Sequence, residues 1–149
     1  MLKLSTRSSY GVRAVFDLAH RQGDTPVRLA AIAERQKIPR SYLQQIFARL
    51  RKSGIVKAIR GPKGGFRLGR SAEEIRIGDV VRALEGDFKP LLCTMPENYG
   101  PDCHVVEGCV SRIVCQKLDG QLNKILDSST LAELCSEAER LTSLKGATS

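Results

Sequence analysis

Residues 39–68 read PRSYLQQIFARLRKSGIVKAIRGPKGGFRL and begin with the pattern of an amphipathic helix. Leu43, Ile46, Phe47 and Leu50 recur at i, i+3, i+4 and i+7, a spacing that places apolar side chains on one helical face. Pro39 suits the first turn, where its missing N–H would be unpaired anyway. Gly54 is expected to end the helix. The sequence therefore predicts a helix over about residues 39–53, with Arg40, Ser41, Gln44, Gln45 and Arg51 facing outward.

The flanking segments complete a recognisable unit around this helix. Residues 29–36 read as a shorter helix with Leu29, Ile32 and Ala33 facing inward, and a break at residues 37–38 separates the two helices. Residues 55–59 and 65–68 read as strands joined by a turn rich in glycine and cations, residues 60–64. Two helices linked by a tight turn and followed by a hairpin are typical of a winged helix-turn-helix domain.

The rest of the chain is predicted to be mainly helical, so the expected fold class is mainly α with one small β-hairpin. Helical periodicity predicts helices over about residues 8–22, 77–84, 110–126 and 130–144. Glycine and proline recur between residues 85 and 108, which favours a loop there. A loop of that length in a small domain is usually functional or disordered.

The charge of the chain is divided unevenly. The 149 residues carry a net charge of +8, but residues 1–90 hold 19 Lys and Arg against 8 Asp and Glu, whereas residues 91–149 hold 5 against 8. A basic N-terminal part favours a polyanionic partner, because each phosphate contact releases condensed counterions. Neither a membrane-spanning run nor a signal peptide is visible, so a cytoplasmic location is expected. His20 and His104 form no catalytic constellation, and an enzyme is not expected.

The outward face of the 39–53 helix carries side chains that can bind nucleic acid. Gln and Ser can both donate and accept hydrogen bonds at base edges, and Arg can hold bases or phosphates. A solvated helix face would have the same composition, but Arg60, Lys63 and Arg67 around the glycine turn add a second cationic element. The sequence therefore predicts double-stranded DNA binding through Arg40, Ser41, Tyr42, Gln44, Gln45, Arg51, Arg60, Lys63 and Gly64.

The five cysteines indicate metal or redox chemistry, because no secretion signal points to a disulfide framework. Cys93, Cys103 and Cys109 lie in the loop or at its edge, outside any apolar periodicity, and thiolates are the usual ligands of iron–sulfur clusters. Their spacing is not that of a zinc ribbon. Cys115 lies at helical spacing with Leu118 and favours core packing over a ligand role. Cys135 is expected to be a small buried hydrophobe.

Several of these stretches resemble the IscR/NsrR/RirA family of winged-helix regulators. The matching segments are residues 10–14 (YGVRA), 41–47 (SYLQQIF), 50–54 (LRKSG), 60–66 (RGPKGGF), 77–81 (IGDVV) and 130–134 (TLAEL). The similarity runs to about residue 142, and the Arg-Gly-Pro-x-Gly-Gly turn is its most specific part.

The resemblance implies a homodimer built on the long helix after the loop and an iron–sulfur cluster, 2Fe–2S or 4Fe–4S, on three loop cysteines. Register assigns these metal ligands to Cys93, Cys103 and Cys109. Family members supply a fourth ligand at positions that are Arg112 and Ser9 here, so neither carries over. Cys115, His104, Glu107 and a group from the partner subunit stay open as the fourth ligand.

The expected organisation therefore has three parts. Residues 1–88 form the winged helix-turn-helix DNA-binding domain, residues 89–108 the cysteine-rich cluster-binding loop, and residues 109–145 the dimerisation helix and C-terminal helix. The expected function is a DNA-binding transcription regulator, most simply a repressor, controlled by its cluster. Two alternatives stay open: a metal-free thiol redox-sensing regulator, and a winged helix that binds protein.

Overall fold

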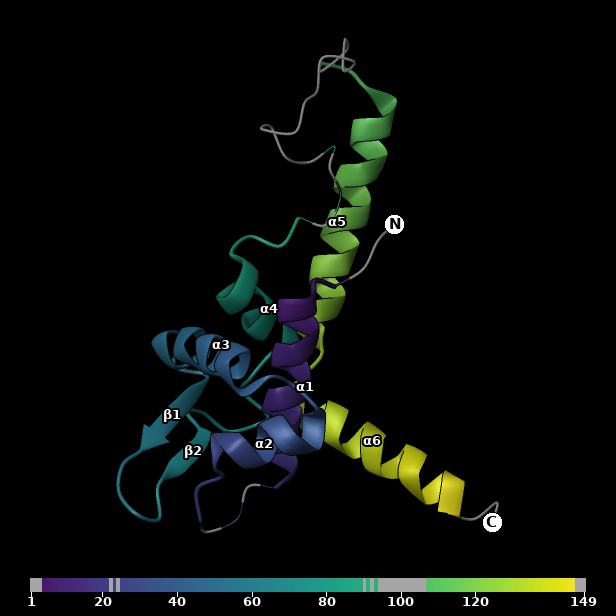
Figure 1. The fold of residues 1–149 in the computed structure, drawn as a ribbon. Helices are drawn as coiled ribbons and strands as arrows, with labels where there is room; N and C mark the ends of the chain where they lie inside the picture. The colour runs from purple at the N-terminus through teal and green to yellow at the C-terminus, as the bar shows by residue number, and fades with distance from the viewer. Residues whose placement is uncertain are drawn as a thin grey trace.

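The computed structural model describes residues 4–21, 23, 25–89, 91, 93 and 107–146. Within them the elements are α1 (Thr6–His20), α2 (Leu29–Gln36), α3 (Arg40–Lys52), β1 (Val56–Ile59), β2 (Gly65–Leu68), α4 (Ile77–Glu85), α5 (Val110–Ser128) and α6 (Leu131–Gly146). Helices α1 to α4 pack together beside the hairpin. Helix α5 extends upward from this group and α6 extends downward and to the right (Figure 1). This mainly helical winged architecture confirms the predicted fold class.

The turn between α2 and α3 depends on an unusual backbone conformation at Lys37. This residue has a φ of 53° and a ψ of 47°, in the left-handed region, which costs a non-glycine residue about 1 kcal/mol. The conformation lets Ile38 N–H donate to Ala33 O at 3.0 Å and places the Ile38 side chain in the core. Pro39 is the N-cap of α3, one residue before the helical position that the sequence suggests.

The hairpin is a two-stranded antiparallel sheet in which Val56 pairs with Leu68 and Ile59 with Gly65. A further bridge joins Val27 to Phe66, so the hairpin is held against the segment before α2. The guanidinium of Arg28 donates to the Pro62 carbonyl oxygen at 3.1 Å. The hairpin is therefore anchored at its base and near its tip. We call this hairpin, residues 56–68, the wing.

The core lies between α1, α3, α4 and the base of the wing. All four apolar positions predicted for α3 are buried, together with residues from every neighbouring element; the largest fully buried side chains are Phe47, Leu18, Ile32, Leu43, Ile46, Leu50, Ile55, Ile75, Leu84, Leu131, Val15 and Val56. Phe47 meets Phe66 edge to face, with ring centroids 4.8 Å apart. The same hydrophobic cluster therefore holds both α3 and the wing in place.

A polar junction joins α5 to α4. Arg82 of α4 forms a salt bridge with Asp127 near the C-terminal end of α5 and a hydrogen bond to Asn123 Oδ1 at 3.4 Å. The Asn123 amide donates to the Phe88 carbonyl oxygen at 3.1 Å. Helix α5 is thus attached near its C-terminal end to α4 and to the segment that follows α4.

Helix α6 begins with a capping box. Thr130 Oγ1 accepts from Glu133 N–H at 3.1 Å, and Glu133 Oε2 accepts from Thr130 N–H at 2.9 Å. Leu131, at the first helical position, is fully buried in the core. Among the described helices, none has both the length and the apolar character needed to cross a bilayer.

Candidate functional site

The outward face of α3 presents the polar side chains that the sequence assigned to it. Arg40, Ser41, Gln44, Gln45 and Arg51 are all exposed. Their exposure follows from the helical period, because the opposite face is occupied by the four buried apolar residues. The face therefore offers hydrogen-bond donors, acceptors and cations to a partner outside the molecule.

Tyr42, also predicted to bind DNA, lies partly in the protein. It is half-buried, and its ring meets Tyr10 of α1 edge to face with centroids 5.8 Å apart. The Arg13 guanidinium lies 5.5 Å from the centre of the Tyr10 ring. Tyr42 thus connects the start of α3 to α1, and only part of its surface remains available.

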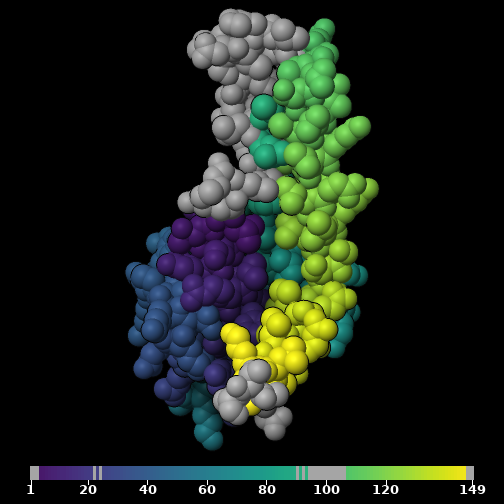
Figure 2. All heavy atoms as spheres, turned by 90° about the vertical axis from the view of Figure 1, so that its right-hand side faces the viewer, coloured from purple at the N-terminus to yellow at the C-terminus, as the bar shows by residue number. Residues whose placement is uncertain are grey.

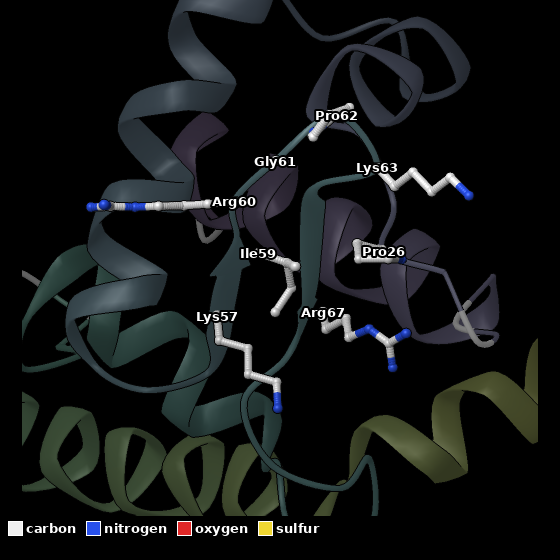
Figure 3. A pocket seen from close by; sticks show the side chains of 8 residues that line it. All are labelled: Pro26, Lys57, Ile59, Arg60, Gly61, Pro62, Lys63 and Arg67. Atoms are coloured by element: carbon white, nitrogen blue, oxygen red, sulfur yellow. The ribbon is translucent and has the colours of Figure 1, made fainter.

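The wing carries cations on both sides of its turn. Arg60 and Lys63 are exposed, and Figure 3 shows Arg60 extending from one side of the hairpin while Lys63 and Arg67 extend from the other. Lys57 and Arg67 line the same hollow as the turn. The sequence analysis did not predict Lys57 as a DNA-binding residue. Its position on a strand next to a cationic turn could have indicated it.

Glycine is required inside this turn. A Cβ on Gly64 would lie 2.2 Å from the Ile59 carbonyl oxygen, and one on Gly65 would lie 2.5 Å from the Val27 carbonyl oxygen. Gly61 has a φ of +109°, a conformation that L side chains rarely adopt. The glycines therefore permit the tight backbone path that presents Arg60 and Lys63.

Helix α3 and the wing share one surface. Arg40, Gln44 and Arg51 of α3 line a hollow together with Phe66 of β2 and Leu29 of α2. A ligand that occupies this hollow contacts the exposed helix face and the base of the wing at once. This juxtaposition is the one that a winged helix uses to approach duplex DNA.

An ion pair between a buried carboxylate and a partly exposed guanidinium holds α2 against α1 behind this surface. Asp17 of α1 is nearly fully buried and accepts from the Arg35 guanidinium at 2.6 Å and from the Gln36 amide at 2.9 Å. Burial alone would raise the pKa of Asp17, but the hydrogen bonds from Arg35 and Gln36 and the Arg35 charge outweigh it, so this pKa is lowered. The orientation of α2, and with it the start of α3, depends on this pair.

Cysteines gather beside the N-terminal part of α5. Cys109 is the N-cap of α5, Cys115 lies in its second turn, and both are half-buried, whereas Cys93 is exposed. Burial raises the pKa of Cys115, and the hydrogen bond that its thiol donates to Cys93 raises it further. Asp119 and Cys109 add smaller electrostatic effects in the same direction. Cys93, Cys109 and Asp119 thus all contribute to the raised pKa of Cys115.

The predicted trio of ligands is described only in part, because Cys103 lies outside the described residues, as do His104 and most of the 89–108 loop. In the part of the chain that is described, no three His, Cys, Asp or Glu side chains lie close enough to hold one metal ion. A cluster distributes its ligands over more than one iron atom, and the thiol chemistry of Cys93 and Cys109 suits such a group. Glu107 is exposed.

The two faces of α5 differ in character. Cys115, Asp119, Asn123 and Leu126 follow one another at helical spacing and face the protein's own α4 and the segment after it. Asp119 is only 8% exposed, and both its carboxylate oxygens lack a hydrogen-bond partner among the described residues. Val110, Ile113, Val114, Leu118 and Ile125 are exposed. Figure 2 shows α5 as an upright column with α6 below it.

The remaining two candidate side chains lie away from this cysteine group. Cys135 of α6 is half-buried rather than buried as predicted, and its pKa is raised by burial and then by Glu139. His20 stacks on Phe16 with ring centroids 5.7 Å apart and lies 3.7 Å from Glu139. His20 therefore joins α1 to α6.

Comparisons with known proteins agree with this geometry. A family model described as "Rrf2: Iron-dependent Transcriptional regulator" matches residues 4–137. The HTH-type transcriptional regulator IscR of Erwinia tasmaniensis is 37% identical over 140 residues, which cover 94% of this chain and 82% of that protein.

Solved structures give the same result. T. potens IscR superposes with a TM-score of 0.78 at 40% identity, covering 94% of this chain and 90% of that one. CymR, described as the global cysteine regulator of B. subtilis, superposes with a TM-score of 0.77 at 34% identity, covering 92% of this chain and 98% of that one. The chain is therefore a member of the Rrf2 family of DNA-binding transcriptional regulators.

Proposed function

We propose that this regulator binds a two-fold symmetric operator as a homodimer, with operator binding controlled by an iron–sulfur cluster on Cys93, Cys103 and Cys109. The observation that supports operator binding is the surface shared by α3 and the wing. Arg40, Ser41, Tyr42, Gln44, Gln45 and Arg51 approach base edges and adjoining phosphates in the major groove. Arg60, Lys63 and the closely packed Gly64 bring the wing to the neighbouring backbone.

The second copy is proposed to cover the apolar face of α5. Val110 is 72% exposed and Ile125 is 60% exposed, with three more large apolar side chains between them. Such a stripe on one helix is costly in water, and the same stripe on a two-fold related helix would cover it. Paired α5 helices would then hold two α3 helices over half-sites about 34 Å apart, one turn of B-DNA.

The cluster is proposed to act through the position of the loop relative to α5. When bound, an iron–sulfur cluster supplies a cross-link between thiolates that responds to oxidants and to iron supply. Cys109, as the N-cap, ties such a link to the first turn of α5, and Arg82 ties the other end of α5 to α4. In this proposal, residues 1–88 bind DNA, residues 89–108 hold the cluster and residues 109–145 form the dimer. We infer repression as the simplest outcome.

The DNA half is tested by the salt dependence of operator binding. Each phosphate contact adds about 0.9 to the slope of log affinity against log salt concentration, so Arg60→Ala and Lys63→Ala should each flatten the slope by about one. Lys145→Ala is a matched control, because Lys145 is an exposed lysine on α6. Equal slopes for the wing variants and the control would contradict DNA contact by the wing and would favour a protein partner for this winged helix.

The cluster half is tested by anaerobic purification with iron and sulfide analysis and a visible absorption spectrum. We expect a coloured protein whose iron content falls in Cys109→Ser and is unchanged in Cys135→Ser, the control on α6. A colourless wild-type protein without iron would reject the cluster and leave the DNA half standing. A metal-free thiol redox-sensing regulator is the second candidate, because the family relative CymR of Staphylococcus aureus has been solved in an oxidized form.

A further inference from the structure

Arg13 of α1 is connected to both helices of the helix-turn-helix unit, although it belongs to neither. Its Nη2 donates to the carbonyl oxygen of Gln36, the last residue of α2, and its Nε donates to Gln36 Oε1 at 3.3 Å. Its guanidinium also lies over the Tyr10 ring, 5.5 Å from the ring centre. One exposed side chain therefore joins the end of α2 to an aromatic ring of α1.

The first of these contacts holds the end of α2, where the turn toward α3 begins. Lys37, which follows Gln36, has the left-handed backbone conformation of that turn. The carbonyl groups in the last turn of a helix carry partial negative charge and lack donors within the helix, so they favour a guanidinium. The Gln36 amide also donates to Asp17 at 2.9 Å. Arg13 and Asp17 together therefore fix the direction in which the chain leaves α2.

The second contact reaches α3 through two aromatic rings. Tyr10 meets Tyr42 edge to face with centroids 5.8 Å apart, and Tyr42 is the third residue of α3. A guanidinium over an aromatic ring is attracted to its π face, and paired rings prefer a defined geometry. In a helix-turn-helix protein the N-terminal residues of the second helix contact base edges. The two contacts of Arg13 therefore act on the part of α3 that must be placed most accurately.

We propose that Arg13 is a positioning residue for operator specificity, which holds the first turn of α3 where its side chains reach base edges. This inference rests on the proposed entry of α3 into the major groove. Hydrogen bonds to base edges need their donors and acceptors within about 0.5 Å of the productive position. The long cationic side chains of the wing, by contrast, can follow a phosphate through a small shift. Loss of Arg13 should therefore weaken binding to the operator far more than binding to unrelated DNA.

The experiment uses the full-length protein and two labelled duplexes of equal length, one selected by the wild-type protein from random sequences and one unrelated to it. Fluorescence anisotropy at several salt concentrations gives both affinities. Arg13→Ala should lower their ratio about tenfold, the discrimination of one base contact. The salt slope should stay unchanged, whereas loss of a phosphate contact would lower it by about 0.9. Arg140→Ala is the matched control, because Arg140 is an exposed arginine on α6 that pairs with Glu137.

Variants of Tyr10 test the aromatic connection. Tyr10→Phe keeps the ring and should keep the wild-type ratio, whereas Tyr10→Leu should lower it. Arg13→Ala should have a smaller effect in the Tyr10→Leu background than in the wild type, because the connection to α3 is already lost there. Arg13→Lys should restore only part of the ratio, because an ammonium keeps the charge but lacks the planar fork. Circular dichroism at the assay temperature measures the folded fraction, and a folding defect would lower both affinities equally.

Three results would each overturn the positioning role: equal losses on the two duplexes, a salt slope lowered by about one, or an undiminished effect of Arg13→Ala in the Tyr10→Leu background. A Gln44→Ala, Gln45→Ala double variant separates this inference from the proposed function. If the double variant keeps the wild-type ratio, the proposed base contacts of α3 and the role of Arg13 both fail. If the double variant lowers the ratio and Arg13→Ala does not, only the role of Arg13 fails.

Discussion

Gly64 offers the sharpest test of how the wing is built. A Cβ at this position would lie 2.2 Å from the Ile59 carbonyl oxygen and 2.9 Å from the Gly61 carbonyl oxygen, both backbone atoms. Ordinary contacts of a carbon atom with a non-bonded heavy atom begin at about 3.5 Å. Gly64→Ala therefore requires the backbone to move by about 1 Å. No rotamer change can relieve the contact, because neither atom belongs to a side chain.

The cost follows from what the movement breaks. Overpacking of this kind costs about 1–3 kcal/mol. Opening the turn also removes the hydrogen bond from Gly64 N–H to Gly61 O at 2.9 Å, worth about 1 kcal/mol. We expect the free energy of unfolding to fall by about 2 kcal/mol, because the tip of the wing can open without unfolding the core. Arg60 and Lys63 would then lose their fixed positions, which should weaken operator binding about tenfold and flatten its salt slope by about two.

Urea denaturation followed by far-ultraviolet circular dichroism measures the stability, and fluorescence anisotropy of a labelled operator at several salt concentrations measures the binding. Gly120→Ala is the matched control, because a Cβ there meets no atom within 4 Å. Gly120 lies inside α5, so alanine should raise the stability by about 0.5–1 kcal/mol. If Gly64→Ala kept wild-type stability and salt slope, the reasoning about the wing would be refuted.

Three further predictions concern the supports of this surface. Asp17→Asn removes the carboxylate that accepts from Arg35 and Gln36 and should cost about 2 kcal/mol in urea denaturation. The folded-state pKa of Asp17 is lowered from 3.8, so its contribution to the free energy of unfolding is complete above about pH 4 and is lost as the pH falls through the folded pKa. The wild type should show this loss of stability on acid titration, and the Asn variant should not. Leu118→Glu on the exposed face of α5 should shift sedimentation toward monomer, whereas Lys145→Glu on α6 should leave the dimer intact; unchanged sedimentation of the Leu118 variant would exclude this face as the subunit contact. Thr130→Ala removes half of the capping box of α6 and should lower the free energy of unfolding by about 1 kcal/mol, measured against Ser136→Ala within the same helix; equal losses would rule out a specific cap.

Much of the DNA-binding half could be predicted because it rests on local patterns. The i, i+3, i+4, i+7 spacing of Leu43, Ile46, Phe47 and Leu50 fixes which face of α3 is buried, and the opposite face follows automatically. Residues 29–36 and 65–68 are observed as the helix and strand that their sequences predict. The other helices differ from their predicted limits by one or two residues, where caps such as Ser5 and Thr130 decide the first turn.

Contacts between distant segments were beyond the same reasoning. The bridge from Val27 to Phe66, the Asp17–Arg35 pair and the salt bridge from Arg82 to Asp127 each join elements whose separation carries no periodic signal. The cysteines show the same limit. Helical spacing indicated core packing for Cys115, but it could not show that Cys93, which lies after α4, affects the pKa of this thiol.

Among the described residues, the salt bridge and hydrogen bond from Arg82 attach α5 to α4 near the C-terminal end of α5, so the helix can act as a lever arm. At about 1.5 Å per residue its 19 residues extend for about 28 Å, and Arg82 holds the end opposite the cysteines. A shift of about 2 Å at Cys109 then corresponds to a tilt of about 4°. In a two-fold pair the two α5 helices would tilt together. A shift of this size at Cys109 would therefore rotate one winged helix-turn-helix domain relative to the other.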